Sequence, residues 1–569
     1  MILETLNKEL TNIVADYAKE LEIELSDQQK KLIEFEISED GERADYSSSS
    51  PLKLAKIFKL NPIDIGEKIV GGLNQQEILK ANLEGPGFIN VHIRPEIKFE
   101  AMKEALKADS AWGKQNKTNK KVLVEFVSSN PTGPLHVGHG RGAVLGMAIS
   151  NLLEAIGCDV SREYYVNDAG RQISILTCSI ILNSYVKNFP TEGTYEGDYI
   201  KALSSEFVKD YGNLETELVF NNYDEDPDIR LDSITHQLKS ENPKLWEAAK
   251  RFSVNKILEI IKTELHEFEI IHDKWFSESS LGSIEESSSD LNKSLSDIEA
   301  KDHTYRKEGA IWFKTTSFGD DKDRVLLREN NEPTYYLTDV GYHKNKIDRN
   351  FDLCINVFGA DHHGYIPRLT AAFDVMKSEG QEIEFVLYQL VNLHEEGIKK
   401  SMSTRRGEFY SLADLRKELG PDVIKFFFLE KKSDHTMDFD LDLAKDESKN
   451  NPYFYAQYAY VRCCSILSKS EFDDNGPIDL DELNNHFELL SKMINFPHFI
   501  DSYAMERSPH SLVHFVKSFS SAFHSFYENN PVITDDITKS NTRLFITTMT
   551  KLILKNSFKI LNVTPLERM

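Results

Sequence analysis

Long apolar runs, C-x-x-C pairs and an excess of basic residues are all missing from this sequence. No hydrophobic run approaches the roughly 20 residues that a membrane-spanning helix needs, so no membrane span is expected. The start of the chain carries acidic residues throughout and alternates at helical spacing. That pattern is typical neither of a secretory signal nor of a transit peptide. We therefore expect a cytoplasmic protein.

The five cysteines are scattered along the chain, without a C-x-x-C pair and without a histidine at metal-ligand spacing. They are Cys158, Cys178, Cys354, Cys463 and Cys464. Such spacing argues against a disulfide framework and against structural zinc. Buried, reduced thiols and no metal site are expected.

Basic residues are outnumbered, and the formal net charge is −25. This balance argues against a nucleic-acid partner, because phosphate neutralisation usually needs clustered Lys and Arg. The charge is uneven, however: residues 491–569 hold nine Lys and Arg against six Asp and Glu. Since a large protein can bind RNA with a local patch of basic residues, the overall charge is only weak evidence against a nucleic-acid partner.

The length of 569 residues predicts several domains, at about 150 residues each. Hydrophobic residues make up 40% and charged residues 28% of the chain, as in soluble globular proteins. We expect an α/β unit over residues 1–115 and a nucleotide-binding sheet over 116–445. A helical insertion is expected near 190–300, and an all-helical domain over 446–569.

The first unit contains a turn at residues 85–87 followed by an alternating strand from Phe88 to Ile93. Residues 47–70 fit a serine cap, a proline in the first turn and one amphipathic helix. After residue 443 everything is expected to be helical.

A strand, loop, helix and strand follow one another from Lys121 onward. Residues 122–129 predict the strand, 130–135 the loop, and His136 to Ile156 a long helix. Residues 161–168 predict the next strand, and a right-handed crossover makes the two strands parallel. Further short strands are predicted at 310–316, 324–328, 334–341 and 354–360.

The strongest chemical signal is the tetrapeptide His136-Val137-Gly138-His139 at the start of the long helix. The two histidines lie on one face of the first turn. Free backbone N–H groups and the positive end of the helix dipole point the same way, and Gly138 leaves room for a nucleotide. The imidazoles can then hydrogen-bond phosphates as charge moves onto pyrophosphate. A chance pair of surface histidines is the alternative, which the strand–loop–helix context disfavours.

Residues 124–173, which contain this tetrapeptide, resemble the catalytic entry of class I aminoacyl-tRNA synthetases, and of the arginine enzymes in particular. Members of the class share this H-x-G-H and a later K-M-S-K-S loop on a Rossmann-like domain. The resemblance implies an α/β catalytic domain with ATP, accompanied by Mg²⁺, as a substrate.

A second match lies in residues 391–415, where Met402-Ser403 stands in place of the K-M-S-K-S loop. The sequence departs from the motif, because Ser401 and Thr404 occupy the two lysine positions and Arg405 occupies the final serine position. The resemblance implies catalytic roles for Met402, Ser403 and Arg405. The cation that meets the phosphates stays open among Lys399, Lys400, Arg405 and Arg406. A basic surface turn is the alternative.

A third match concerns the amino-acid pocket. The resemblance places Tyr335 and Asp339 there, four residues apart, with Glu125 and Asn130 on the first strand and its loop. A guanidinium has five N–H donors and no acceptor, so carboxylates are its natural partners. A strand acid whose only role is to satisfy a structural arginine is the alternative for Glu125. The resemblance adds Ser129, His139 and His363 to the arginine site, and His136, Gly138, Gly359, Asp361, His362, Lys400 and Met402 to the ATP site.

The C-terminal region provides a fourth match. Residues 451–467 and 554–569 resemble the opening helix and the closing segment of an anticodon-binding domain. Tyr455 and Tyr458 could stack on bases, and the resemblance places Met569 near the same bases. An aromatic stripe that packs in the core is the alternative. Residues 1–115 resemble a domain that lies against the tRNA elbow.

Together the matches imply an arginine–tRNA ligase: L-arginine is activated to an adenylate and transferred to the 3′ end of tRNA(Arg). A monomer is expected, and the resemblance implies that tRNA binds before arginine is activated. Another class I synthetase, or an H-x-G-H nucleotidyltransferase, is one alternative. A catalytically inactive relative that only binds tRNA or a protein partner is another, because the second motif lacks its lysines.

Overall fold

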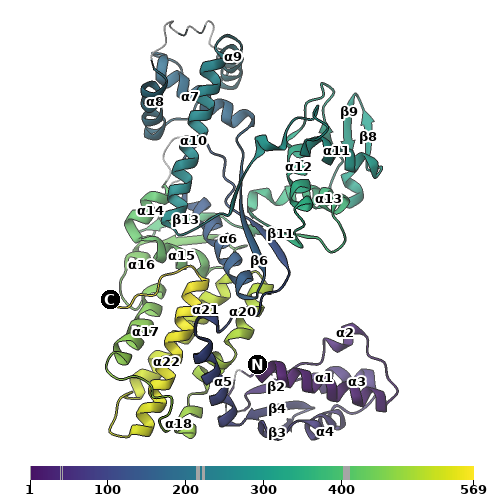
Figure 1. The fold of residues 1–569 in the computed structure, drawn as a ribbon, viewed down its shortest axis with the longest axis vertical. Helices are drawn as coiled ribbons and strands as arrows, with labels where there is room; N and C mark the ends of the chain where they lie inside the picture. The colour runs from purple at the N-terminus through teal and green to yellow at the C-terminus, as the bar shows by residue number, and fades with distance from the viewer. Residues whose placement is uncertain are drawn as a thin grey trace.

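The computed structural model describes residues 2–569 except 39, 42, 213–217, 219, 221–223 and 401–409. Figure 1 shows a central sheet, a bundle of helices above it, a C-terminal helical part below it and an N-terminal unit that projects to one side. Among the helices so described, none is long and apolar enough to cross a membrane.

The N-terminal unit is an antiparallel sheet covered by helices. Its strands, in the order β1-β2-β4-β3, are β1 (Glu36–Ile37), β2 (Tyr46–Ser48), β4 (Phe88–Ile93) and β3 (Ile78–Glu84). Its helices are α1 (Ile2–Glu20), α2 (Asp27–Lys30), α3 (Ser50–Phe58) and α4 (Pro62–Gly72). The strand predicted from Phe88 to Ile93 is confirmed. The single helix predicted over 47–70 is wrong, because Lys59 is left-handed with a φ of 55° and Asn61 caps a new helix.

The central sheet is parallel throughout, which confirms the predicted Rossmann-like α/β class. Its strands, in the order β12-β11-β5-β6-β7, are β12 (Glu382–Tyr388), β11 (Leu353–Gly359), β5 (Lys121–Glu125), β6 (Asp159–Val166) and β7 (Lys274–Ser277). The helix α6 (Val137–Ala155) crosses from β5 to β6, as predicted. The strand β7 was not predicted; it follows the helical insertion directly.

Four helices extend upward from the sheet: α7 (Gly170–Tyr185), α8 (Asp198–Tyr211), α9 (Pro227–Glu241) and α10 (Pro243–Glu267). We call α8 to α10 the helical insertion. Its buried side chains, such as Leu203, Phe207 and Trp246, sit at helical spacing, so the predicted helices are present.

A second lobe, at the right of Figure 1, lies between β7 and β11. It holds α11 (Asp290–Ala300), α12 (Tyr335–Asp348) and an antiparallel sheet of β8 (Thr304–Lys307), β9 (Ala310–Phe313) and β10 (Arg324–Leu327). After β11 come the short helix η4 (Ala360–Tyr365) and α13 (Ile366–Met376), which packs on α12. The predicted strand at 334–341 is wrong: Thr334 accepts a hydrogen bond from the Leu337 N–H and starts α12 there.

After the parallel sheet the chain forms a small three-stranded sheet and then helices. Its strands are β13 (Val391–Glu395), β14 (Ile398–Lys399) and β15 (Met437–Asp440), with α14 (Leu412–Leu419), α15 (Pro421–Glu430) and α16 (Leu441–Lys445) around them. The helices predicted beyond residue 443 are confirmed. They are α17 (Pro452–Leu467), α18 (Leu480–Asn484), α19 (Phe487–Ile494), α20 (Phe496–Met505), α21 (Pro509–Asn529) and α22 (Ile537–Ile560).

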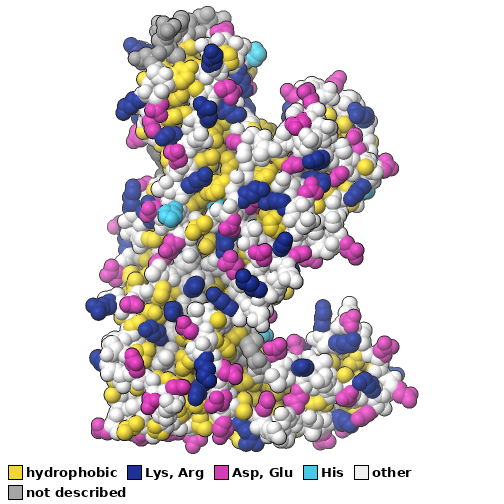
Figure 2. All heavy atoms as spheres, viewed as in Figure 1, with side chains coloured by type: hydrophobic (Ala, Val, Ile, Leu, Met, Phe, Trp, Pro, Cys, Tyr) yellow, Lys and Arg dark blue, Asp and Glu magenta, His cyan; other side chains and the backbone are white. Residues whose placement is uncertain are grey.

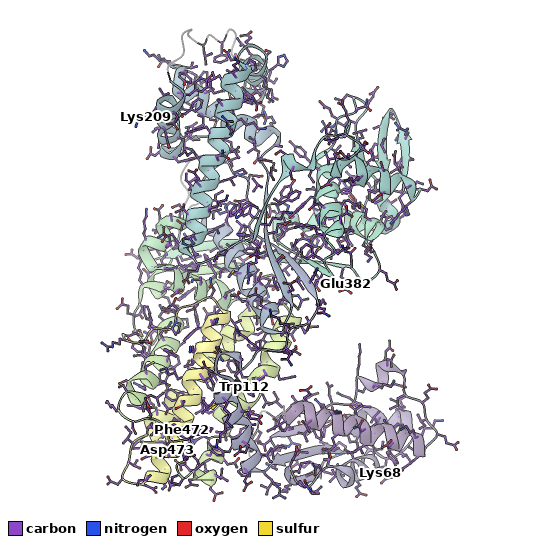
Figure 3. The ribbon with its side chains drawn as sticks, in the orientation of Figure 1. Lys68, Trp112, Lys209, Glu382, Phe472 and Asp473 are labelled. Atoms are coloured by element: carbon purple, nitrogen blue, oxygen red, sulfur yellow. The ribbon has the colours of Figure 1, made fainter. Side chains whose placement is uncertain are left out.

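The helix α5 (Pro95–Ala108) joins the N-terminal unit to the C-terminal helices α18, α19 and α22. Trp112, just beyond α5, lies beside these helices in Figure 3 and donates its indole N–H to the Met493 carbonyl at 3.2 Å. In Figure 2 an open space separates the projecting N-terminal unit from the lobe of α11 to α13.

Candidate active site

The loop between β5 and α6 leaves the sheet through a strained turn. Val127 and Ser128 have positive φ angles of 69° and 42°, which are rare for residues other than glycine. The Ser128 N–H donates to the Phe126 carbonyl at 3.0 Å and closes a three-residue turn. This turn brings Ser129 and Asn130 to the carboxyl edge of the parallel strands, where open α/β sheets bind ligands.

His136 and His139 stack on each other at the start of α6, with ring centroids 3.6 Å apart. The His136 Nδ1 accepts hydrogen bonds from the N–H groups of Gly138 at 3.1 Å and His139 at 3.4 Å. The His139 Nδ1 in turn accepts from the His136 N–H at 3.4 Å. The pair therefore forms a reciprocal cap of the helix.

This cap corrects one expectation. The N–H groups of Gly138 and His139 are bonded to the His136 ring and do not face an open site. Gly138 also has a more specific role than leaving room for a nucleotide. A Cβ at this position would lie 3.0 Å from Cε1 and 3.1 Å from Nδ1 of His136, so glycine lets the ring reach its capping position.

Both imidazoles are neutral near pH 7. Burial lowers the pKa of His139 to about 3, with the charge of His136 adding to the effect, and burial also lowers the pKa of His136. Since each Nδ1 accepts a hydrogen bond, the proton of each neutral ring lies on Nε2. The two rings therefore offer neutral Nε2–H donors, which suit the oxygens of a phosphate.

The segment that matches the K-M-S-K-S loop ends beside the H-x-G-H tetrapeptide. Ser411 pairs with His136 in an isolated antiparallel bridge, and the Leu412 N–H donates to the Leu135 carbonyl at 2.9 Å. Met402, Ser403 and Arg405 lie outside the described residues. Lys400, immediately before them, forms an ion pair with Glu395.

Asp339 faces the site from α12. The Tyr365 hydroxyl donates to its carboxylate at 2.7 Å. Burial raises the pKa of Asp339 to about 7, and the carboxylates of Glu278 and Glu125 add to the rise although the Tyr365 hydrogen bond opposes it. Burial and the charge of Asp168 likewise raise the pKa of Glu278. Such a group of carboxylates at a ligand-binding edge favours a cation as its occupant.

Glu125 has an internal partner, as in the alternative considered for it, but this partner is a lysine and not an arginine. It is buried, and its carboxylate accepts from the Lys346 ammonium at 2.5 Å and from the Ser128 hydroxyl at 2.9 Å. Lys346 also donates to the Asn356 side chain at 2.6 Å. The charge of Glu125 is thus balanced from within the protein, and the acid holds the strained loop to β11 and α12.

The remaining predicted residues surround the same edge. Tyr335 is 60% exposed on the first turn of α12, with its hydroxyl beside Gly170. Asn130 is exposed, whereas Ser129 is buried and shares a hydrogen bond with the Tyr164 hydroxyl at 2.8 Å. Gly359 ends β11, and Asp361, His362 and His363 are exposed on η4 directly after it.

Sequence reasoning missed three residues of this site, namely Glu278, Lys346 and Tyr365. Tyr365 and Lys346 stand within matched segments, but no spacing rule links them to Asp339 or Glu125. Glu278 belongs to a stretch that was interpreted as part of the insertion. Within the described ranges, no group of three or more His, Cys, Asp or Glu residues could hold a metal ion.

The predicted anticodon residues lie on α17 and at the C-terminus. Tyr458 is 37% exposed and donates to the Glu447 carbonyl at 3.0 Å, and the Tyr455 ring packs on His524 with centroids 4.6 Å apart. Met569 lines a cleft of about 880 Å³ formed by α17, α22 and the end of the chain. Phe472, labelled in Figure 3, belongs to the same cleft.

Three family models match the N-terminal unit, the catalytic part and the C-terminal helices separately. Residues 3–93 match the family model described as the arginyl tRNA synthetase N terminal domain. Residues 101–442 match the model described as tRNA synthetases class I (R), catalytic domain. Residues 456–569 match the DALR anticodon binding domain.

Whole-chain relatives agree with the family models. The arginine–tRNA ligase of Syntrophotalea carbinolica is 38% identical and covers 94% of this chain and 95% of the relative. That of Bacillus subtilis is 37% identical and covers 94% of each. The solved structure of Thermus thermophilus arginyl-tRNA synthetase has a TM-score of 0.76 at 20% identity over the full length of both chains, which supports the fold. The chain therefore belongs to the arginyl-tRNA synthetases, a family within the class I aminoacyl-tRNA synthetases.

Proposed function

We propose that this chain attaches L-arginine to the 3′ end of tRNA(Arg) at the expense of ATP, with release of AMP and pyrophosphate. The proposal rests on one arrangement: the capped H-x-G-H helix start and the group of carboxylates around Asp339 lie at one edge of a parallel sheet. Membership of the arginyl-tRNA synthetase family points to the same reaction.

In the first step the arginine carboxylate attacks the α-phosphate of Mg²⁺-bound ATP, and pyrophosphate leaves. The reaction needs no side-chain nucleophile, so catalysis consists of orientation and electrostatic stabilisation. The Nε2–H groups of His136 and His139 would donate to the phosphate oxygens. Neutral imidazoles serve here as fixed donors and do not have to lose a proton. Gly359, Asp361, His362 and Lys400 are the further residues proposed for ATP.

Arginine recognition would centre on Asp339. Its carboxylate is fixed by the Tyr365 hydroxyl and is partly exposed, so a guanidinium can reach its free lone pairs. Tyr335, Asn130, Ser129 and His363 are the further residues proposed for the arginine site. Glu125 adds negative potential at Asp339, although it is itself paired with Lys346.

In the second step a ribose hydroxyl of the terminal nucleotide of tRNA takes the arginyl group from the adenylate. Tyr455, Tyr458 and Met569 are proposed to contact the anticodon, and the N-terminal unit to contact the tRNA elbow. The open space visible in Figure 2 lies between that unit and the catalytic part, where an L-shaped RNA could lie. The domain bounds 1–115, 116–445 and 446–569, the monomeric state and the cytoplasmic location stay predictions.

Arginine-dependent exchange of pyrophosphate into ATP tests the proposal. The assay is run with each of the twenty amino acids, with and without tRNA. We expect exchange with arginine alone, and only when tRNA is present. Exchange with arginine in the absence of tRNA would support the proposed activity but contradict the requirement for tRNA. Exchange with another amino acid would contradict the role of Asp339. Binding of ATP without any exchange would indicate that this chain is a catalytically inactive relative. That alternative remains because the second motif lacks its lysines.

A further inference from the structure

The helical insertion contacts the loop that carries His136. Tyr199 lies in the first turn of α8, and its hydroxyl donates a hydrogen bond to the Thr132 carbonyl at 3.0 Å. Thr132 belongs to residues 130–135, the loop between β5 and α6. The two residues are 67 positions apart, so folding of the insertion itself brings them together.

The same contact includes close packing against the loop. A Cβ on Gly133 would lie 3.2 Å from Oη of Tyr199, which is closer than most Cβ contacts, and 3.4 Å from its Cζ. Tyr195 places its hydroxyl beside the Thr132 side chain. Burial raises the pKa of Tyr199 above its ordinary value, and the hydroxyl therefore stays protonated and remains a donor.

The loop is held at three points. The turn at Val127 and Ser128 fixes its beginning, and the hydrogen bond from Leu412 to Leu135 fixes its end. Tyr199 holds its middle, at Thr132 and Gly133. A shift of this middle part would move the first turn of α6, and with it the two imidazoles.

The helix that carries Tyr199 is itself packed against the rest of the protein. Ile200, Leu203 and Phe207 are buried on one face of α8, which packs on α7. The helix α7 starts at Gly170, beside the Tyr335 hydroxyl of the arginine site. The helix α8 then runs outward to its last turn, which carries Lys209 in Figure 3.

We propose that the helical insertion positions residues 130–135, the loop that leads to His136, through Tyr199. This inference rests on the proposed function, since it concerns the orientation of His136 toward ATP. Tyr199 is a positioning residue: it touches the loop backbone and acts on the nucleotide through that loop.

The substitution Tyr199→Phe removes the hydroxyl and keeps the ring. We expect the KM for ATP in the exchange reaction to rise about three- to tenfold, the range that one net hydrogen bond supports, and the KM for arginine to rise less, because Asp339 lies on α12 and not on this loop. A loss of folded protein would lower kcat and leave both KM values alone, so the change in KM separates positioning from stability.

Tyr185→Phe is the matched control. The Tyr185 hydroxyl also donates to a backbone carbonyl, that of Gly212 at 2.7 Å, beside the insertion and away from the loop. Both variants lose one hydrogen bond of the same kind. An equal KM for ATP in the two variants would overturn the proposal. Gly133→Ala displaces the loop from the opposite side of the contact and should raise the KM for ATP in the same way.

Hydrogen exchange tests the contact independently of activity. The amides of Thr132, Gly133 and Leu135 should exchange faster in Tyr199→Phe than in wild type, and at the wild-type rate in Tyr185→Phe. Equal exchange in all three proteins would refute the support of the loop. If wild type catalyses no pyrophosphate exchange, the proposed function fails, and this comparison still decides whether Tyr199 holds the loop.

Discussion

At the scale of single residues, Asp339 should make arginine binding depend on pH. In the free protein burial and neighbouring carboxylates raise its pKa to about 7, whereas a bound guanidinium would lower it again. Arginine binding therefore releases a proton when the pH lies below this value. We expect the KM for arginine to be constant above pH 7 and to rise toward about tenfold for each pH unit below it.

The measurement is the KM for arginine from about pH 5.5 to about pH 8.5, with the KM for ATP as the internal control. Asp339→Asn removes the titrating group, so its KM for arginine should be flat in this range and about 100-fold higher at the alkaline end. A wild-type KM for arginine that does not change with pH would contradict the assignment of Asp339.

His136 combines capping and chemistry in one ring, and two substitutions can separate them. Asparagine is a good N-cap residue but lacks the Nε2–H donor, whereas alanine lacks both functions. We expect His136→Asn to keep the wild-type stability and to lower the exchange rate about 100-fold. His136→Ala should show the same loss of rate and also lose about 1 kcal/mol of stability. Urea unfolding and pyrophosphate exchange measure the two effects, and full activity of His136→Asn would exclude the ring from catalysis.

At the scale of elements, the correctly predicted strands and helices are those with a clear local sequence pattern. The strand from Phe88 to Ile93 and the helix from His136 were correct, because alternation and the loop before the helix determine them locally. The segment 334–341 was interpreted as a strand from its β-prone tyrosines, and the cap at Thr334 decided otherwise. The partner of Glu125 could not be foreseen, since Lys346 is 221 residues away.

Lys346 links three elements, and its loss should lower the free energy of unfolding. Glu125 is on β5, Lys346 is on α12 and Asn356 is on β11, and all three are buried. Lys346→Met leaves the Glu125 carboxylate buried without a cation, which we expect to destabilise the catalytic part by about 3–5 kcal/mol. The double variant Glu125→Gln with Lys346→Met should recover most of this loss. Denaturant unfolding followed by tryptophan fluorescence measures both, and a loss below about 1 kcal/mol for the single variant would contradict the account.

At the scale of the whole molecule, the N-terminal unit is attached through a buried polar joint. Lys98 on α5 forms an ion pair with Asp45 at 2.6 Å and donates to Asn484 at 2.8 Å. The Tyr46 hydroxyl donates to the Asn495 side chain at 3.0 Å. These bonds connect the N-terminal sheet to the C-terminal helices, so we expect the two regions proposed to touch tRNA to move together.

The joint predicts how a change far from the sheet affects tRNA use. Lys98→Met leaves Asp45 buried without its cation and should loosen the N-terminal unit, because an unpaired buried charge costs several kcal/mol. We expect the KM for tRNA to rise about tenfold, with the KM for ATP unchanged at saturating tRNA. Small-angle X-ray scattering should show a larger radius of gyration. Lys103→Met is the control, since Lys103 lies on the same helix and meets Asp474 at 3.5 Å near the surface. If both variants use tRNA equally well, the joint does not set the position of the N-terminal unit, and tRNA itself must order it on binding.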